Sequence, residues 1–571
     1  RVPSRVHIFC RDAPAAALEA TCKPVPLPRV SRPAPARGAT PALTESGDLY
    51  REWDVRAHVE AIRAGTLPNH GWAIRDAHES DLEEGGDQSF HSRETAQDPP
   101  EITLPELELR YAAAPAAPPP PRDATLVNRS DVACGEIITE STRLTADVTG
   151  CLGEGVAIGA PNIILDLNGH TIKGGLILEP GEEDVLTPGI RNSYPNVEIR
   201  GPGVVTNFGY GVLLGPGTTY GDVHGLTLYR NALAGVNLFD ADNGRTGNHV
   251  YGNRIDSNGE TGIQLMAGTE GNVIESNQFL SNGMSIHLDA ASRNEIIGND
   301  ISGLIIDPML DSDAGIVLEN GSRHNLLKNN NISDTGDAGI VIHAGSHDTR
   351  IEGDRDAGRG LLVRNGDAGV IAEASNRIHI TGITSYQQSD GGVVLGDSSG
   401  SSITNSDLRF NPSGVSASNT NNLIVSGNDV SNSLQAGIEL GNGLGMRIAD
   451  NTANLTGGSG ISLETAAFDA LGNAVGGALI ENNTTNENAE HGIAVEVAKH
   501  TIRGNSAYNN AGFGILAGEA PVPGEAPDPN RNTDGGGNKA SGNLEIVNCL
   551  GVVCDESATV PITPLDATAP G

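Results

Sequence analysis

The sequence predicts an all-β solenoid because one short phrase recurs through most of the chain. In each copy, Gly is followed by Ile or Val, then any residue, and then most often Leu, Val or Ala. Successive copies are mostly about 22 to 24 residues apart, a spacing typical of stacked structural repeats. Aromatic residues make up only 3% of the chain, so narrow layers of Val, Ile and Leu must fill the interior. The copies begin at Gly211, Gly235, Gly262, Ser285 (a variant), Gly315, Gly339, Gly369, Gly392, Gly414, Gly437, Gly460, Gly492 and Gly514.

Each repeat is expected to contribute two strands to a coil. In the Gly-Ile-x-Leu phrase, the period of two turns Ile and Leu inward and x outward. The preceding segments, which contain Asn253, Asn277, Asn299 and Asn428, predict the second strand. Stacked Asn side chains can bond one another from coil to coil and satisfy the backbone of the turns. The repeated Gly and Asn positions are therefore assigned structural roles.

The composition excludes several classes of function. The formal net charge is -36, which argues against nucleic-acid binding because phosphate contacts need a basic face. An acidic surface instead suits solubility or divalent cations. No apolar run approaches the roughly 18 residues of a membrane span. No signal peptide is visible, and the chain begins at Arg1 rather than Met, which we interpret as processing or truncation.

The cysteines fall into local pairs along the sequence. Nothing near them supplies the His residues or second CxxC that a zinc site needs. Six cysteines allow 15 pairings, and local pairing is typical of proteins in oxidising compartments. We therefore expect an extracellular or cell-surface protein. The expected disulfides join Cys10 with Cys22, Cys134 with Cys151, and Cys549 with Cys554.

Residues 1–111 have a different sequence pattern, without the repeated phrase. The segments Trp53-Asp54-Val55, 69–74 (NHGWAI), 90–94 (FHSRE) and 105–111 (PELELRY) resemble the C-terminal half of the DNRLRE-type β-sandwich modules of secreted bacterial proteins. Some members of that family bind polysaccharides such as alginate. The resemblance implies a partial sandwich, to be completed by an upstream segment or by another chain. Residues 112–122 are a Pro- and Ala-rich linker.

Residues 123–554 form the second expected domain. The opening segments 134–138 (CGEII) and 162–172 (NIILDLNGHTI) and the closing segment 536–554 resemble secreted right-handed parallel β-helix repeat proteins. The resemblance implies a right-handed parallel β-helix of about 13 coils with caps at both ends, followed by a flexible tail, 555–571. Asp166 and His170 in the opening are assigned structural roles. Lyases, epimerases, hydrolases and non-enzymatic surface proteins all use this scaffold, so the motifs specify fold better than activity.

Candidate chemistry comes from rows of outward residues. Because coils stack at about 4.8 Å, equivalent positions form a ladder along the outside of the solenoid. Five titratable side chains are expected on one face, where imidazoles and carboxylates could divide the roles of acid and base. His287 or His343 would be the base and Glu319 its acid partner. The candidate catalytic residues are His287, Asp289, Glu319, His343 and Glu373.

A second row lies two residues before the repeated Gly. Four acidic side chains on consecutive coils repel one another, and Ca²⁺ would relieve that repulsion through oxygen ligands. Alternatively, Asp occupies these positions because it is a good turn residue. The candidate metal ligands are Asp313, Asp337, Asp367 and Asp390.

Longer repeats interrupt the same region, at about 303–312 and 354–364, and others occur at about 240–247 and 465–474. Inserts in solenoids concentrate on the binding face, which predicts a groove between about residues 285 and 395. Arg355, Arg359 and Arg364 could bind a uronate carboxylate there, or pair with neighbouring Asp residues. Tyr386 could replace the missing Lys of a lyase base.

Two hypotheses remain for the function. The first is a secreted or cell-surface protein that binds, and as a lyase, epimerase or hydrolase modifies, an acidic polysaccharide or cell-surface glycan. Against an enzyme stands the absence of sharp epimerase or pectin-hydrolase signatures. The alternative is a non-catalytic structural, adhesin or filament-forming protein whose N-terminal sandwich is completed by a neighbouring copy of the chain.

Overall fold

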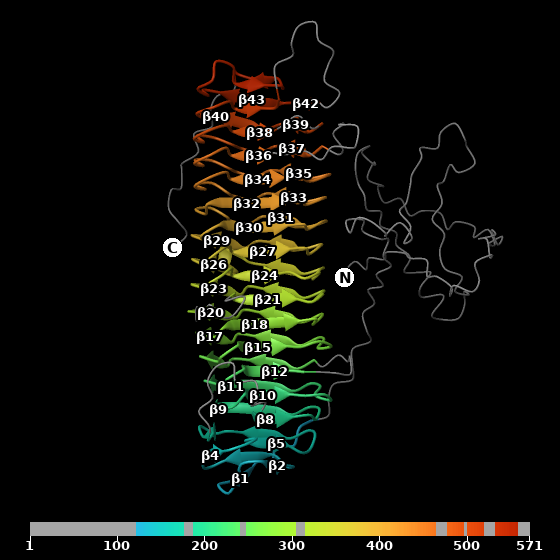
Figure 1. Ribbon diagram of the computed structural model, residues 1–571, viewed down its shortest axis with the longest axis vertical. Coiled ribbons are helices and arrows are strands. Elements are labelled where there is room, and N and C mark those ends of the chain that lie inside the picture. The colour runs from blue at the N-terminus through green and yellow to red at the C-terminus, as the bar shows by residue number, and fades with distance from the viewer. Residues whose placement is uncertain are drawn as a thin grey trace, which may run out of the picture. The chain divides into compact units, whose positions relative to one another are not determined.

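The computed structural model describes residues 121–175, 187–239, 247–303, 314–463, 477–495, 499–518 and 531–557. The chain divides into two compact units, Arg1–Pro118 and Pro119–Gly571. The predicted sandwich, most of the linker, the Cys10–Cys22 pair, Asp313 and most of the predicted tail lie outside the described residues. The described part of the second unit is a column of stacked coils running from its N-terminal to its C-terminal end (Figure 1).

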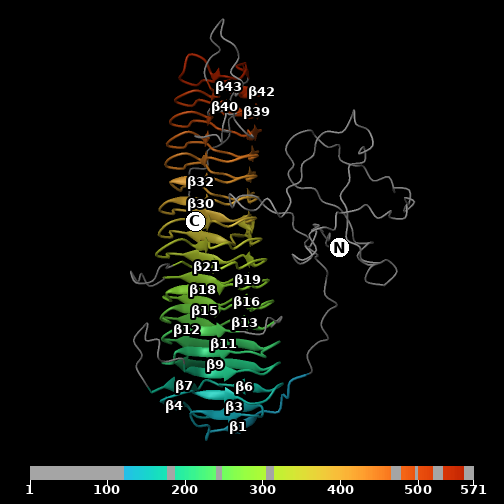
Figure 2. The same cartoon turned by 45° about the vertical axis from the view of Figure 1, so that its right-hand side comes forward.

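Each full coil contributes strands to three parallel columns, which we name faces I, II and III. Figure 2 shows the same stack from a second direction. Faces I and II run into one another through the long strands β9 (Glu198–Thr206) and β11 (Asp222–Tyr229). All the paired strands of the three faces are parallel, which confirms the predicted β-helix. Among the described residues, no helix is long and apolar enough to cross a membrane.

The strands of face I, with β9 and β11 between β6 and β13, are β1 (Val127–Arg129), β3 (Thr142–Leu144), β6 (Ile164–Asp166), β13 (His249–Tyr251), β16 (Val273–Glu275), β19 (Glu295–Ile297), β22 (Leu326–Lys328), β25 (Arg350–Glu352), β28 (His379–Thr381), β31 (Ser402–Thr404), β33 (Ile424–Ser426), β35 (Arg447–Ala449), β37 (Leu479–Glu481), β39 (Thr501–Arg503) and β42 (Thr533–Gly536).

The strands of face II, again with β9 and β11, are β4 (Val148–Cys151), β7 (Thr171–Gly174), β14 (Arg254–Asp256), β17 (Gln278–Leu280), β20 (Asp300–Ser302), β23 (Asn331–Ser333), β26 (Leu361–Val363), β29 (Thr384–Tyr386), β40 (Ser506–Tyr508), β43 (Asn538–Ser541) and β45 (Cys554–Asp555). Single bridges through Asp407, Asp429, Thr452 and Thr484 continue the column between β29 and β40.

The strands of face III are β2 (Glu136–Ile138), β5 (Val156–Ile158), β8 (Pro188–Asn192), β10 (Tyr210–Leu214), β12 (Ala234–Leu238), β15 (Thr261–Leu265), β18 (Met284–Asp289), β21 (Ile316–Glu319), β24 (Ile340–Ile342), β27 (Val370–Glu373), β30 (Gly391–Gly396), β32 (Ser413–Ser418), β34 (Ile438–Gly441), β36 (Ile461–Leu463), β38 (Ile493–Val495), β41 (Ile515–Leu516) and β44 (Cys549–Leu550).

Every copy of the sequence phrase forms a strand of face III, from β10 to β41. Strands β2, β5, β8 and β44 extend the face without the phrase, so the described column has more rungs than the repeat count of about 13. The prediction of two strands per coil was wrong, because the chain bends just before the repeated Asn and so forms a third strand. For example, Ser276, with a positive φ of 53°, lies at the bend that separates β16 from β17.

The interior confirms the predicted inward positions. Ile263, Ile286 and Ile316 occupy the same position on adjacent strands and are fully buried. The repeated Gly is required by the close approach of the next coil. A Cβ atom added at Gly262 would lie 2.6 Å from the carbonyl oxygen of Ser285, a distance at which the coils could not keep their spacing.

Buried Asn side chains connect the coils at the bends. Asn277 donates through Nδ2 to Asn299 Oδ1 at 3.1 Å and to the carbonyl oxygen of Val250 at 2.9 Å. Its own Oδ1 accepts from the backbone N–H and the Nδ2 of Asn253, at 3.1 and 3.0 Å. Similar rows run through Asn231, Asn258 and Asn282, and through Asn428, Asn451, Asn483, Asn505 and Asn538. The predicted structural role of these residues is confirmed.

Two of the three predicted disulfides are present. Cys134 is joined to Cys151 beside the first coils, and Cys549 is joined to Cys554 between β44 and β45. The covalent links therefore lie at the two ends of the described column, where a coil has a neighbour on one side only.

Removal of one Asn from this row should destabilise the fold. In Asn277→Ala, the backbone N–H of Asn253 and the carbonyl of Val250 lose buried partners, which should lower the free energy of unfolding by about 3 kcal/mol. Urea denaturation of the full chain measures this. The control is Gln278→Ala, since the adjacent side chain is exposed. Equal midpoints for the two variants would contradict the structural role.

Candidate functional site

The sequence-predicted cluster on face III comes from three successive strands. Glu319, at the end of β21, forms a hydrogen bond between its Oε1 and His287 Nε2 at 2.9 Å. Its other oxygen, Oε2, lies 3.3 Å from His343 Nε2, immediately after β24. A carboxylate thus connects imidazoles from the coil before it and the coil after it, and the structure brings together three of the five predicted catalytic residues.

The three side chains differ in their access to solvent. The side chain of His287 is 9% exposed, that of Glu319 26% and that of His343 40%. The Nδ1 atom of His287 is buried and lacks a hydrogen-bond partner among the described residues, as does the hydroxyl of Ser285 in the same strand. Buried polar atoms are ordinarily paired, so this strand retains unused hydrogen-bonding capacity.

Asp289 and Glu373 flank the cluster. Asp289 is the register partner of Glu319 on β18 and accepts from Asn320 Nδ2 at 2.8 Å. Glu373 ends β27 and is exposed. The predicted row is therefore present on consecutive strands, but the close contacts within the described part of it join Glu319 to His287 by a hydrogen bond and to His343 by an ion-pair contact.

Two amide side chains extend the cluster toward the N-terminus. Asn237, Gln264 and His287 are register partners on β12, β15 and β18. Asn237 Nδ2 donates to Gln264 Oε1 at 2.7 Å. Beyond His287 the same position holds Val317, Val341 and Ile371. The outward row therefore changes from polar to apolar at the cluster. Both amides occupy the x position of the repeated phrase, in the copies at Gly235 and Gly262.

The acidic row is stacked as the sequence predicted, as far as it is described. The backbone N–H of Asp390 donates to the carbonyl of Asp367 at 2.9 Å, and that of Asp367 to the carbonyl of Asp337 at 3.4 Å. Burial raises the pKa of the Asp367 carboxyl, and the negative charges of Asp390, Asp337 and Glu373 raise it further. Within the described ranges, no group of three His, Cys, Asp or Glu side chains is placed to hold a metal ion, and the Ca²⁺ site stays a prediction.

The predicted substrate-binding residues lie on other parts of the coil. Arg355 begins the short 3₁₀ helix η2 (Arg355–Ala357) between β25 and β26, at the bend from face I to face II, and Arg359 follows it. Arg364 donates from Nε and Nη2 to the two carboxylate oxygens of Asp334, at 2.8 and 2.9 Å. Tyr386 ends β29 on face II and is 7% exposed. The sequence expected them in a groove between about residues 285 and 395; the structure has them at the bend from face I to face II and along face II, and not on face III with His287.

The family described as "Right handed beta helix region" matches residues 210–368 and 368–521. The chain belongs to this right-handed β-helix family. No curated protein matches its sequence.

Several solved structures are similar to this β-helix protein. The A-module of the mannuronan C-5 epimerase AlgE4 of Azotobacter vinelandii is 14% identical, with a TM-score of 0.29 over 61% of this chain and 87% of that chain. The periplasmic alginate epimerase AlgG is 12% identical, with a TM-score of 0.24 over 64% of this chain and 79% of that chain. A GH87 α-1,3-glucanase of Streptomyces thermodiastaticus is 14% identical, with a TM-score of 0.31 over 63% of this chain and 62% of that chain. At these values the likenesses carry no argument about the activity of this chain.

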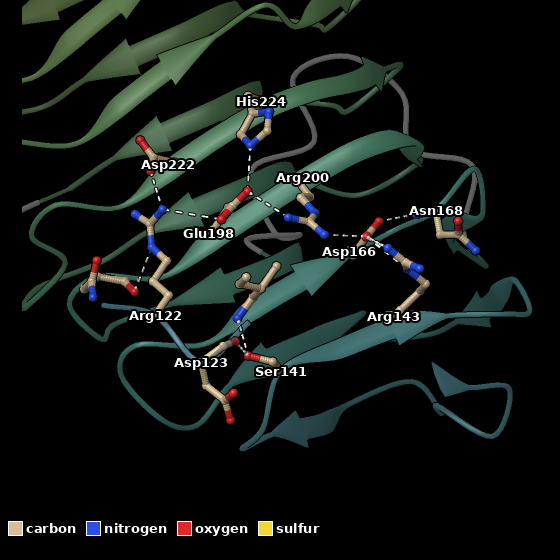
Figure 3. A network of polar contacts seen from close by, with 12 residues as sticks. Arg122, Asp123, Ser141, Arg143, Asp166, Asn168, Glu198, Arg200, Asp222 and His224 are labelled. Atoms are coloured by element: carbon tan, nitrogen blue, oxygen red, sulfur yellow. Dashed lines mark hydrogen bonds and ion pairs between the residues drawn. The ribbon is translucent and has the colours of Figure 1, made fainter. Parts of the chain in front are cut away.

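A second polar network of the β-helix protein crosses face I in its first coils (Figure 3). Asp166, which is 4% exposed, accepts from Arg143 Nη2 at 3.0 Å and Arg200 Nη2 at 2.9 Å. Burial opposes its ionised form, but the two guanidinium groups outweigh burial and lower its pKa. The structural role predicted for Asp166 agrees with this pairing. The role predicted for His170 is structural too, and it contacts Asp147 at 3.1 Å.

Glu198 and Asp222 continue the network. They are register partners on β9 and β11. Glu198 contacts His224 Nε2 at 3.1 Å and Arg200 Nη1 at 3.3 Å through Oε1. Although burial opposes ionisation, these two contacts lower the pKa of Glu198. Arg122 Nη1 lies 2.6 Å from Asp222 Oδ2 and 3.5 Å from Glu198 Oε2. Sequence reasoning missed this network because most of its members lie before the first copy of the phrase at Gly211 and Arg122 lies in the linker.

The pKa of Asp367 makes stability depend on pH. Because the folded-state pKa lies above the ordinary value, the folded chain holds this proton more tightly than the unfolded chain. The carboxylate therefore reduces stability as pH rises through this range, and Asp367→Asn should raise the unfolding midpoint at pH 7 but not near pH 3. Thermal unfolding at both pH values checks this. Asp356→Asn, at an exposed Asp, is the control, and an unchanged midpoint at pH 7 would contradict the repulsion.

Proposed function

We propose that this chain is an extracytoplasmic polysaccharide-acting protein whose site is centred on Glu319 of face III. The observation that supports the site best is the line of His287, Glu319 and His343 across three coils, in which Glu319 is hydrogen-bonded to His287 and lies 3.3 Å from His343. The two disulfides support an oxidising compartment. The disulfides thus support the location, and the titratable side chains of face III support the chemistry.

The repetition of the fold suits a repetitive ligand. Parallel strands about 4.8 Å apart present equivalent side chains at intervals close to the length of one sugar unit. A glycan lying along the column would meet the half-buried Gln264, whose amide can donate to and accept from hydroxyl groups, before it reaches His287. The half-buried Val341 would then face the less polar surface of a sugar ring.

His287, Glu319 and His343 are groups suited to general acid–base catalysis. His343 is the most exposed of the three groups and would exchange a proton with the substrate. Glu319 would orient His343 and stabilise its charged form, as a carboxylate does for an imidazole base. His287, on the other carboxylate oxygen, would hold Glu319 in position, and its buried Nδ1 could bond a water molecule.

The reaction class is acid–base chemistry on a glycan, as in a lyase, an epimerase or a hydrolase. Proton abstraction beside a uronate carboxylate needs a group that neutralises the developing charge. Arg355 and Arg359 leave the coil at another bend, so neither lies on face III beside Glu319 to neutralise a uronate carboxylate. A panel must therefore include neutral as well as uronic-acid polysaccharides.

Substitution of Glu319 tests the proposal. Glu319→Gln keeps the shape but removes the charge that orients both imidazoles, and it should lower turnover of the responsive polysaccharide by about 10² to 10⁴-fold. New reducing ends, unsaturated products and changes of sugar configuration by NMR are the readouts. His379→Gln on face I is the matched control. If no polysaccharide in the panel is altered, or if Glu319→Gln is fully active, the catalytic proposal fails.

A structural role is the second candidate, and exposed apolar side chains in the terminal coils favour it. In the described part of the chain, Ile137 and Leu152 are 61% and 76% exposed in the first coils. Ile546 and Val553 are 100% and 76% exposed in the last. Apolar surface and unpaired strand edges at solenoid ends favour association of copies. We propose end-to-end contact between copies as the form this role would take.

Light scattering measures such association directly. The structural candidate predicts a mass that rises with concentration, and Ile546→Asp should return the chain to a monomer. Leu434→Asp is the control, since Leu434 is 73% exposed in the middle of the column. A monomer at all concentrations would exclude end-to-end association.

A further inference from the structure

A hollow of about 570 Å³ lies over the first coils, where face III turns into face I. Its lining includes Asn196, Tyr220 and Gly247, which stand two residues before three successive face I strands, together with Glu198 and Asp222 from two of those strands. Arg122 closes one side. This hollow is on a different part of the coil from Glu319 and the proposed acid–base site.

The guanidinium of Arg122 is fixed by the walls of the hollow. Besides its contacts with Asp222 and Glu198, it donates from Nε to the carbonyl oxygen of Asn196 at 3.2 Å. It also donates from Nη2 to that of Tyr220 at 2.9 Å. Four acceptors from two successive coils thus hold one side chain. Such a rigid arrangement pre-organises the neighbouring carboxylates, which reduces the entropy lost when a ligand binds.

The charges around the hollow are balanced. Arg143, Arg200 and Arg122 alternate with Asp166, Glu198 and Asp222 across the first coils, and each guanidinium is already paired with a carboxylate (Figure 3). A charged ligand, whether a uronate or an ammonium compound, would have to break one of these pairs. A neutral polyol would not, since hydroxyl groups can bond to the lone pairs and N–H groups that remain.

Asp222 retains such an acceptor. Its Oδ2 is taken by Arg122, but Oδ1 lies 3.9 Å from His249 Nδ1, beyond hydrogen-bonding distance. The side chain is 25% exposed. His249 is itself held against Tyr251, with ring centroids 4.2 Å apart, and Tyr251 is stacked on His224 at 4.6 Å. Stacking holds the His249 ring in place, and one carboxylate oxygen of Asp222 stays available to a hydroxyl.

Tyr220 supplies an aromatic surface that the turn does not require. Its φ is 54°, the left-handed conformation that equivalent positions also adopt, whether they hold the small Asn196 and Gly247 or the large Arg293 and Arg377. The ring is 40% exposed and stands beside Gly247, where an added Cβ would come within 3.7 Å of it. The turn accepts side chains of different sizes, and at Tyr220 it places an aromatic ring in the lining of the hollow.

We propose that this hollow binds a neutral sugar unit of a glycan, with the ring face on Tyr220 and hydroxyl groups on Asp222 and Arg122. The inference goes beyond the proposed function because it adds a separate, non-catalytic site on another face of the coil. It rests on the proposed function only in taking a glycan as the ligand. A chain with two such sites would hold a polysaccharide at one place while acting on it at another.

Calorimetric titration of the full chain with neutral tetrasaccharides of glucose, mannose and galactose tests the proposal. Tyr220→Ala should weaken binding of the responsive tetrasaccharide about tenfold, because it removes one large aromatic contact. Asp222→Asn should weaken it as well, since an amide is a poorer acceptor. Tyr194→Ala is the matched control, because Tyr194 is similarly exposed, at 37%, and is not part of the lining. Thermal unfolding confirms that each variant is folded.

The outcomes separate this inference from the proposed function. Weaker tetrasaccharide binding in Tyr220→Ala, with unchanged binding in Glu319→Gln, supports a second site. No binding of any neutral tetrasaccharide, or equal affinity of Tyr220→Ala and the unaltered chain, overturns it. Binding of oligouronates but not of neutral sugars at Tyr220 overturns the ligand class. None of these results depends on whether Glu319→Gln loses turnover.

Discussion

The register between adjacent coils is the constraint on which the rest of the structure depends. Backbone hydrogen bonds pair each strand with the equivalent strand of the next coil, and the buried Asn rows fix the bends between them. Asn277 illustrates the coupling, since its side chain bonds the coil before it and the coil after it. A side chain's offset from the repeated Gly therefore determines which neighbours it meets. Few residues of the outer surface are placed independently of this pattern.

Function must then arise where an otherwise regular row changes its chemistry. On face III, the outward row is polar through Asn237, Gln264 and His287 and becomes apolar at Val317. On face I, acids and guanidinium groups alternate from Arg143 to Asp222. The same geometry serves both places, because side chains on successive rungs come within hydrogen-bonding distance. On face III this closeness connects titratable groups, and on face I it holds the side chains beside the hollow in place.

Sequence-based prediction was most reliable for residues whose place depends on their offset alone. Glu319 and His343 share an offset from the repeated Gly, and this was enough to place them beside each other and near His287. Arg355 and Arg359 could not be placed in this way. Their insert can leave the coil at any bend, and the extra strand in each coil was not recognised. The Arg122 network was missed because most of its members lie before the first copy of the phrase at Gly211, and Arg122 reaches Glu198 across 76 residues of sequence.

The central claim is that a polysaccharide lies on face III beside Glu319, and the histidine signals of the full chain test it most directly. The chain has 15 His residues, and His287→Gln and His343→Gln would assign the two relevant imidazole resonances by NMR. On addition of the responsive polysaccharide, the account predicts that the resonances of His287 and His343 shift while that of His379 on face I does not. Unchanged resonances for His287 and His343, with shifts confined to other histidines, would contradict it.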